Sequence, residues 1–151
     1  MTGDAVEIHD PNLHLKLMEM CDCYLGTDYA ATIQKVADAP SADTQEDALR
    51  YLALALLFTL TEEARQLSLK RKNDKITVTI RHDAEKIALR PPPRVVFNRI
   101  IAIMRAILHL EEDKGGMPLT LGLKNDRIEV QVKLERTADK ETLKVKFPEL
   151  G

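Results

Sequence analysis

The sequence predicts an α+β fold in which helices pack on one face of an antiparallel sheet. Apolar residues recur with helical spacing over roughly the first 65 residues, and the spacing changes to strict alternation at 75–89 and again after 116. Each alternating segment has one apolar face only. Such strands belong to an antiparallel sheet that is covered by helices on one side and exposed to water on the other.

The first two of four predicted helices lie in the leading 40 residues. Asp10 suits the N-cap and Pro11 the first helical position of a helix that runs to about Leu25, and Gly26 then ends it. Thr27 or Asp28 caps a second, shorter helix that runs to about residue 37. These helices form the acidic helical segment, 1–40.

The other two helices each lead into strands. Asp43 and Glu46 form a capping box for a helix over about 45–65, and its nearly continuous apolar run at 51–58 predicts the central buried element. A proline-rich stretch, RPPPR, starts a helix over about 93–112. The predicted units are 44–92 and 93–148, each with one helix and three strands, within a single compact domain.

Six short strands follow from the alternation. They lie around 67–69, at 75–81 and 87–89, and in the segments PLTLGL, RIEVQVKLE and TLKVKF. The polar side of these strands should point into water. The residues predicted to point outward are Lys75, Thr77, Thr79, Arg81, Glu129, Gln131, Lys133, Lys144 and Lys146.

The two units resemble each other in sequence, which predicts an internal repeat. The segments LSLKRKNDKITVTI (67–80) and LGLKNDRIEVQV (121–132) share Leu-x-Leu, then Lys-Asn-Asp, then a base, isoleucine and alternation. The alternative is that Asn-Asp is simply a good hairpin turn between alternating strands, so that two hairpins look alike by chance.

Charge is divided unevenly along the chain. Residues 1–48 carry ten acids and two bases, whereas 65–105 carries eleven bases and three acids. We expect this middle region to form a basic interaction surface. Its predicted members are Arg65, Lys70, Arg71, Lys72, Lys75, Arg90, Arg94, Arg99 and Arg105.

The stretch MEMCDCYLG places two cysteines in the first helix. On a helical wheel Cys21 and Cys23 lie about 160° apart, so they cannot share a metal ion while the helix is intact. We expect a buried Cys21, a partly exposed Cys23, no metal and no cofactor. The apolar side of this helix must be covered by the domain's own core or by a second subunit, and its predicted interface residues are Leu13, Leu17, Cys21, Tyr24 and Leu25.

The sequence contains no phosphate-binding glycine loop, nucleophile elbow or zinc-ligand spacing. We therefore expect a non-catalytic protein interaction or regulatory module that forms a homodimer or binds a protein partner, through an acidic helical segment and a basic surface. Nonspecific nucleic-acid binding through 65–105 is the alternative, and a small-ligand protein or an enzyme with an unrecognised site is a lesser one. The start of the chain shows no targeting pattern and the longest apolar run, at 51–60, is too short for a membrane span, so we expect a cytoplasmic protein.

Overall fold

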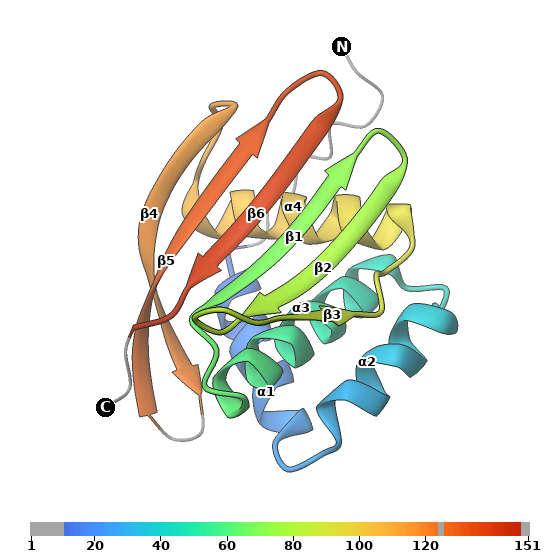
Figure 1. The fold of residues 1–151 in the computed structure, drawn as a ribbon, viewed down its shortest axis with the longest axis vertical. Helices are drawn as coiled ribbons and strands as arrows, with labels where there is room; N and C mark the ends of the chain where they lie inside the picture. The colour runs from blue at the N-terminus through green and yellow to red at the C-terminus, as the bar shows by residue number, and fades with distance from the viewer. Residues whose placement is uncertain (1–10, 124–125, 149–151) are drawn as a thin grey trace.

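Four helices lie behind a six-stranded antiparallel sheet, which confirms the predicted α+β class (Figure 1). The computed structural model describes residues 11–123 and 126–148. The elements are α1 (Leu13–Tyr24), α2 (Tyr29–Asp38), α3 (Thr44–Thr61), β1 (Gln66–Lys72), β2 (Lys75–Arg81), β3 (Lys86–Leu89), α4 (Arg94–Leu108), β4 (Lys114–Leu123), β5 (Asp126–Arg136) and β6 (Lys140–Lys146).

Side-chain caps set the starts of α2 and α3 as the sequence predicts. The carboxylate of Asp28 accepts a hydrogen bond from the Ala31 N–H at 3.1 Å, and that of Asp43 accepts one from the Glu46 N–H at 3.0 Å. The reciprocal half of the capping box is absent, because the Asp43 N–H donates to Ser41 instead. At α1 the N-cap position belongs to Asn12, and the predicted cap, residue 10, lies outside the described residues.

The fourth helix ends at Leu108, four residues before the predicted end. His109 adopts the left-handed conformation, with φ 54°, and the Leu110 N–H donates to the Arg105 carbonyl at 3.0 Å. This is a helix C-cap built without glycine. It turns Leu110 against Gly115, where an added Cβ would lie 2.6 Å from Leu110 Cδ1.

The strand order is β3-β2-β1-β6-β5-β4, so the pairing of β1 with β6 joins the two halves of the chain. The first hairpin turns at Asn73-Asp74, with Asn73 at φ 53°. In the second copy of the predicted repeat Asp126 is the first residue of β5, and residues 124–125 lie outside the described residues. A two-fold axis between the units would place β1 beside β4, but β1 pairs with β6. The internal duplication therefore stays a prediction.

The buried centre of the molecule is α3, as the apolar run at 51–58 predicts. It packs against α1, α2, α4 and β1, and its side chains from 51 to 57 are at most 1% exposed. The Tyr51 hydroxyl donates to the Arg90 carbonyl at 2.5 Å, and burial raises the pKa of this phenol, so it stays a neutral donor. With the helices filling one side of the sheet, the other side faces water (Figure 1).

Candidate anion-binding face

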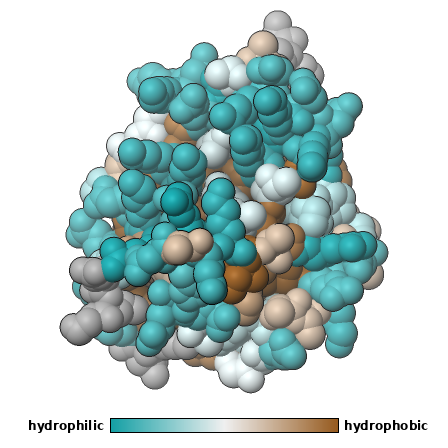
Figure 2. Space-filling model, viewed as in Figure 1, coloured by the Kyte–Doolittle hydropathy of each residue, from teal (hydrophilic) through white to brown (hydrophobic). Residues whose placement is uncertain are grey.

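The face of the sheet turned away from the helices is densely basic. Outward positions alternate along each strand with buried Leu, Ile and Val positions, and the nine side chains predicted to point outward do so. Figure 2 shows hydrophilic side chains over the upper part of this face. We call it the open sheet face: its basic residues are Lys70, Lys72, Lys75, Arg81, Lys86, Lys114, Arg127, Lys133, Lys140, Lys144 and Lys146, and its acids are Glu129 and Glu135.

Several of these cations stand directly opposite one another on paired strands. Like charges at such positions destabilise a sheet, because their Cβ atoms lie only about 4.5–5.5 Å apart. Within 11–123 and 126–148, no side chain of these residues forms an ion pair that would offset the repulsion. The opposed pairs are Lys72 with Lys75, Lys72 with Lys140, Arg81 with Lys86, and Lys133 with Lys144.

This arrangement predicts a substitution that stabilises the fold. We expect Lys144→Gln to raise the free energy of unfolding by about 0.2–1 kcal/mol, because it removes the repulsion between Lys133 and Lys144. Urea unfolding at low salt measures the change, and Lys35→Gln on α2 is the control that loses the same charge elsewhere. The gain should shrink in 0.5 M NaCl through screening. A loss of stability in Lys144→Gln would contradict the prediction.

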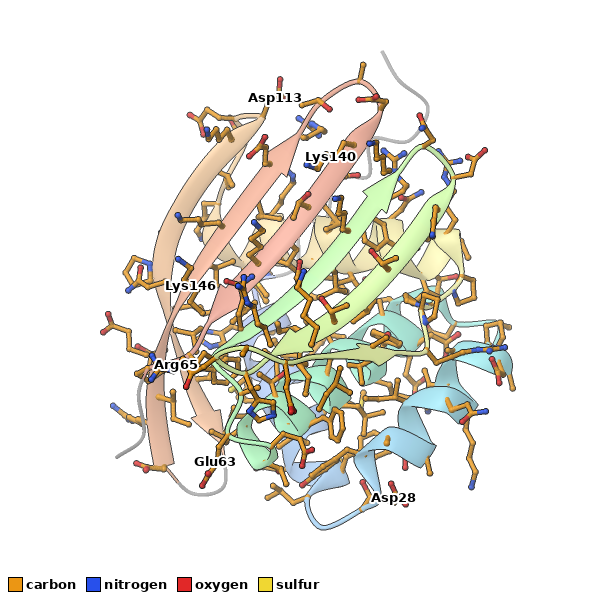
Figure 3. All side chains as sticks on the ribbon, viewed as in Figure 1. Asp28, Glu63, Arg65, Asp113, Lys140 and Lys146 are labelled. Carbon is orange, nitrogen blue, oxygen red and sulfur yellow. The ribbon has the colours of Figure 1, made fainter. Side chains whose placement is uncertain are left out.

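Within the described part of the chain, hollows lie at three places on the open sheet face and its margin. The largest of them, about 580 Å³, lies over the β1–β2 turn and includes Lys70, Lys72 and Lys75. A second, about 450 Å³, lies over β1, β6, β5 and β4, and a third, about 330 Å³, lies at the other end, beside Arg65 and Lys146. Figure 3 shows Lys140 and Lys146 at opposite ends of β6, so basic side chains line the whole length of this central strand.

The structure brings together only part of the basic surface that the sequence singled out. Its members on the open sheet face are Lys70, Lys72 and Lys75. Arg71 alternates with them and points toward the helices, where its guanidinium lies 4.0 Å from the Glu141 carboxylate. The nine residues of the predicted basic surface therefore do not form one continuous surface.

The remaining predicted arginines lie at the margin of this face or on the helical side. Arg99 is half-buried on α4. Burial, and next the neighbouring Arg136, lower the pKa of Arg105. The contacts of the others are Arg65 with Asp83 at 3.1 Å, Arg90 with Asp38 at 2.7 Å, Arg94 with Asp74 at 2.7 Å, and Arg105 with the Glu112 carbonyl at 2.7 Å.

The predicted helical interface is internal to the chain. Leu13, Leu17 and Cys21 are at most 1% exposed, and α1 packs on α3. Tyr24 and Leu25 are half-buried against the same core. The sequence allowed the apolar side of α1 to pack against the domain's own core or against a second subunit, and in the structure it packs against the core. The acidic helices therefore dock through apolar contacts and leave the open sheet face uncovered.

The two cysteines of α1 point in different directions, as the helical wheel predicts. Cys21 is buried and Cys23 is exposed. Burial, with a smaller effect of Asp22, raises the pKa of the Cys21 thiol to about 12. Within the described residues, no three His, Cys, Asp or Glu side chains come together as metal ligands.

We expect iodoacetamide at pH 8 to alkylate Cys23 in the folded protein and to leave Cys21 unmodified. A pKa about three units above the ordinary value leaves roughly one thousandth of the usual thiolate, which is the nucleophile. Mass spectrometry after digestion assigns the modified residue, and the urea-unfolded protein, in which both thiols should react, is the control. Equal labelling of both thiols in the folded state would contradict the burial of Cys21.

Sequence reasoning placed Lys133, Lys144 and Lys146 on the outward side but did not group them with Lys70 and Lys72. The missing information was the pairing of β1 with β6, which sets Lys70 beside Thr142 and Lys72 beside Lys140. Alternation identifies the face of each strand but not its neighbour. Opposed lysines are visible only once the register is known.

Comparisons with known proteins add no assignment. The sequence matches no protein-family model, and no curated protein is similar to it. Among the described helices, none combines the length and apolar character that crossing a bilayer requires. The open sheet face, through its geometry and charge, is therefore the feature of the molecule that indicates a function.

Proposed function

We propose that this protein is a non-catalytic binding module that holds an acidic protein segment across the open sheet face. The observation that carries the proposal is the accumulation of eleven cations against two acids on one exposed face, with like charges directly opposed. A surface that keeps such repulsion loses stability, and an anionic partner would relieve it. Cytoplasmic localisation belongs to the same proposal.

An acidic protein fits this face better than a nucleic acid does. Sheets that bind single-stranded RNA or DNA stack bases on aromatic side chains, and none of the outward strand residues described above is aromatic. Glu129 would repel a phosphate backbone that runs across the face, whereas a protein segment of mixed sequence can offer it a lysine or an amide.

The partner should lie across the face rather than extend the sheet. The edge strand β3 has only four residues and is followed by three prolines, and the other edge strand, β4, carries Pro118. Short edges and prolines disfavour the addition of another strand. Side-chain contacts to lysines are therefore expected to dominate, and binding should weaken steeply with salt.

A second copy of this chain is one acidic partner that the geometry allows. Exposed acids lie on the helices, for example Asp22 and Asp28, and Figure 3 shows Asp28 at the helical end of the molecule, away from Lys140. Contact between this side of one copy and the open sheet face of another would be head-to-tail, so it would build open chains rather than a closed dimer. Light scattering at low and high salt tests this form of the proposal, and mass that grows with concentration only at low salt supports it.

The test of the proposed function is fluorescence anisotropy with a labelled twelve-residue oligoglutamate peptide at low salt. We expect Lys144→Glu to weaken binding roughly ten-fold or more, since about 1.4 kcal/mol corresponds to a factor of ten. Lys35→Glu, which carries the same charge change on α2, should alter it by less than about two-fold if only local charges matter. Equal losses in both variants, or no binding of the wild type, would overturn the proposal.

A labelled single-stranded DNA of twelve nucleotides is the second arm of this experiment. Tighter binding of the DNA than of the peptide, with loss in Lys144→Glu, would assign the face to nucleic acid instead. Circular dichroism checks that each variant is folded, so that a loss of binding cannot be attributed to unfolding.

A further inference from the structure

The hollow over β1, β6, β5 and β4 differs from the rest of the open sheet face because five lysines surround one buried threonine. Its volume is about 450 Å³. Thr142 lies within this set and is only 7% exposed, although it points out from the sheet. The surrounding lysines are Lys70, Lys114, Lys133, Lys140 and Lys144.

The strand register explains how the ring forms. Thr142 stands directly between Lys70 on β1 and Glu135 on β5, and Lys144 stands opposite Lys133. Lys140 and Lys144 lie two residues before and after Thr142 on β6, on the same side of the strand. Long lysine stems can cover a central residue while their ammonium groups reach water, which accounts for the burial of Thr142.

Thr142 is a buried polar residue whose hydroxyl makes no hydrogen bond within the described part of the chain. Its oxygen is not among the enclosed side-chain atoms without a partner, which belong to Arg71 and Arg105, so solvent in the hollow reaches this hydroxyl. Here it lines a hollow that is open to solvent and surrounded by positive charge. A ligand oxygen in the hollow would provide the missing acceptor.

Gly116 keeps one side of this hollow clear. It pairs with Lys133 on the neighbouring strand, and an added Cβ would lie 3.1 Å from the Val132 carbonyl oxygen and 3.2 Å from Lys133 Cγ. A larger residue at this position would press on the Lys133 stem. The glycine therefore leaves space for a ligand beside Lys133.

We infer that this hollow is a binding site for a compact ligand that carries at least two phosphate groups. Five lysines and Glu135 give a net charge of +4 around the hollow. Two phosphate monoesters carry about −1.5 to −2 each near neutral pH, which balances this charge. The ring contains no arginine, so it lacks the planar fork that selects carboxylates, and its lysines act as point charges toward phosphate oxygens.

Isothermal titration calorimetry with inorganic tripolyphosphate in 50 mM NaCl tests this inference. We expect the wild type to bind one equivalent and Thr142→Val to bind about ten-fold or more weakly, since a hydrogen bond to a charged group contributes about 1.5–3 kcal/mol. Thr142→Ser keeps the hydroxyl and should restore most of the affinity. Lys133→Gln should weaken binding, whereas Lys86→Gln, on the same face but outside the hollow, should leave it within about two-fold.

Comparison ligands decide what the hollow recognises. Orthophosphate and citrate are titrated under the same conditions, and both should bind at least ten-fold more weakly than tripolyphosphate. Equal binding of orthophosphate would overturn the paired-phosphate assignment, and equal binding of citrate would leave only nonspecific charge attraction. Wild-type affinity in Thr142→Val, or an equal loss in Lys86→Gln, would overturn the site itself.

The phosphate site and the proposed protein partner use the same face, but different measurements distinguish them. Oligoglutamate binding depends on the whole charged surface and should be nearly unchanged in Thr142→Val. Failure of tripolyphosphate to bind would therefore leave the protein-binding proposal intact. If the peptide does not bind but tripolyphosphate does, the protein-binding proposal is wrong and the small-ligand site remains.

Discussion

Leu17→Ala should lower the free energy of unfolding by about 2–5 kcal/mol, the range observed for leucine truncations in well-packed cores. Leu17 is 0% exposed and belongs to the apolar side of α1 that packs on α3. The truncation removes buried methyl groups and leaves a cavity that the surrounding helices fill only in part. Urea unfolding followed by circular dichroism measures the change.

The same helix supplies a matched control. Leu15 is 57% exposed, and Leu15→Ala should change stability by less than about 0.5 kcal/mol. If both substitutions had the same small effect, α1 would be a peripheral segment rather than part of the core. A large effect confined to Leu17 would show that the acidic helices cannot be removed without unfolding the domain.

Asp47→Ala should lower the free energy of unfolding by about 2–3 kcal/mol. Asp47 is 2% exposed, and its carboxylate accepts hydrogen bonds from the Ser41 N–H at 2.7 Å and the Ser41 hydroxyl at 2.9 Å. Arg50 lies 3.6 Å from the same carboxylate. Hydrogen bonds to a charged group contribute about 1.5–3 kcal/mol, and the substitution removes the buried acceptor of both Ser41 bonds.

A double-mutant cycle with Ser41→Ala separates these contributions. Ser41→Ala removes the hydroxyl bond to Asp47 and the acceptor of the Asp43 N–H, but keeps the backbone bond to Asp47, so it should cost less than Asp47→Ala. The two changes should be non-additive, because they share one interaction. Full additivity, or a loss in Asp47→Ala no larger than in Ser41→Ala, would show that the loop before α3 does not depend on this carboxylate.

Local patterns were sufficient to predict most of the elements. The Asp28 and Asp43 caps set the starts of α2 and α3, the apolar run at 51–58 identified the central helix, and alternation gave all six strands. Each of these features depends on residues that are close in sequence. Such features are the ones that periodicity and capping rules can determine.

The features that sequence reasoning missed depend on distant residues. The end of α4 is set by a left-handed His109 and by the packing of Leu110 on Gly115, and neither the histidine nor the spacing indicates a stop. The basic surface was placed in 65–105, but the pairing of β1 with β6 adds cations from 114–146 to the part of that surface that lies on the sheet. Charge along the chain is a poor guide to charge on a folded surface when strands from both halves meet.

The lysines opposed across β5 and β6 have a practical consequence. Any anion that binds only the folded protein and reduces this repulsion raises its melting temperature, by mass action, as its occupancy rises. Label-free thermal-shift screening of metabolite and peptide collections should therefore report true ligands as upward shifts. The rise in melting temperature then identifies the natural ligand or partner without any assumption about the pathway in which the protein acts.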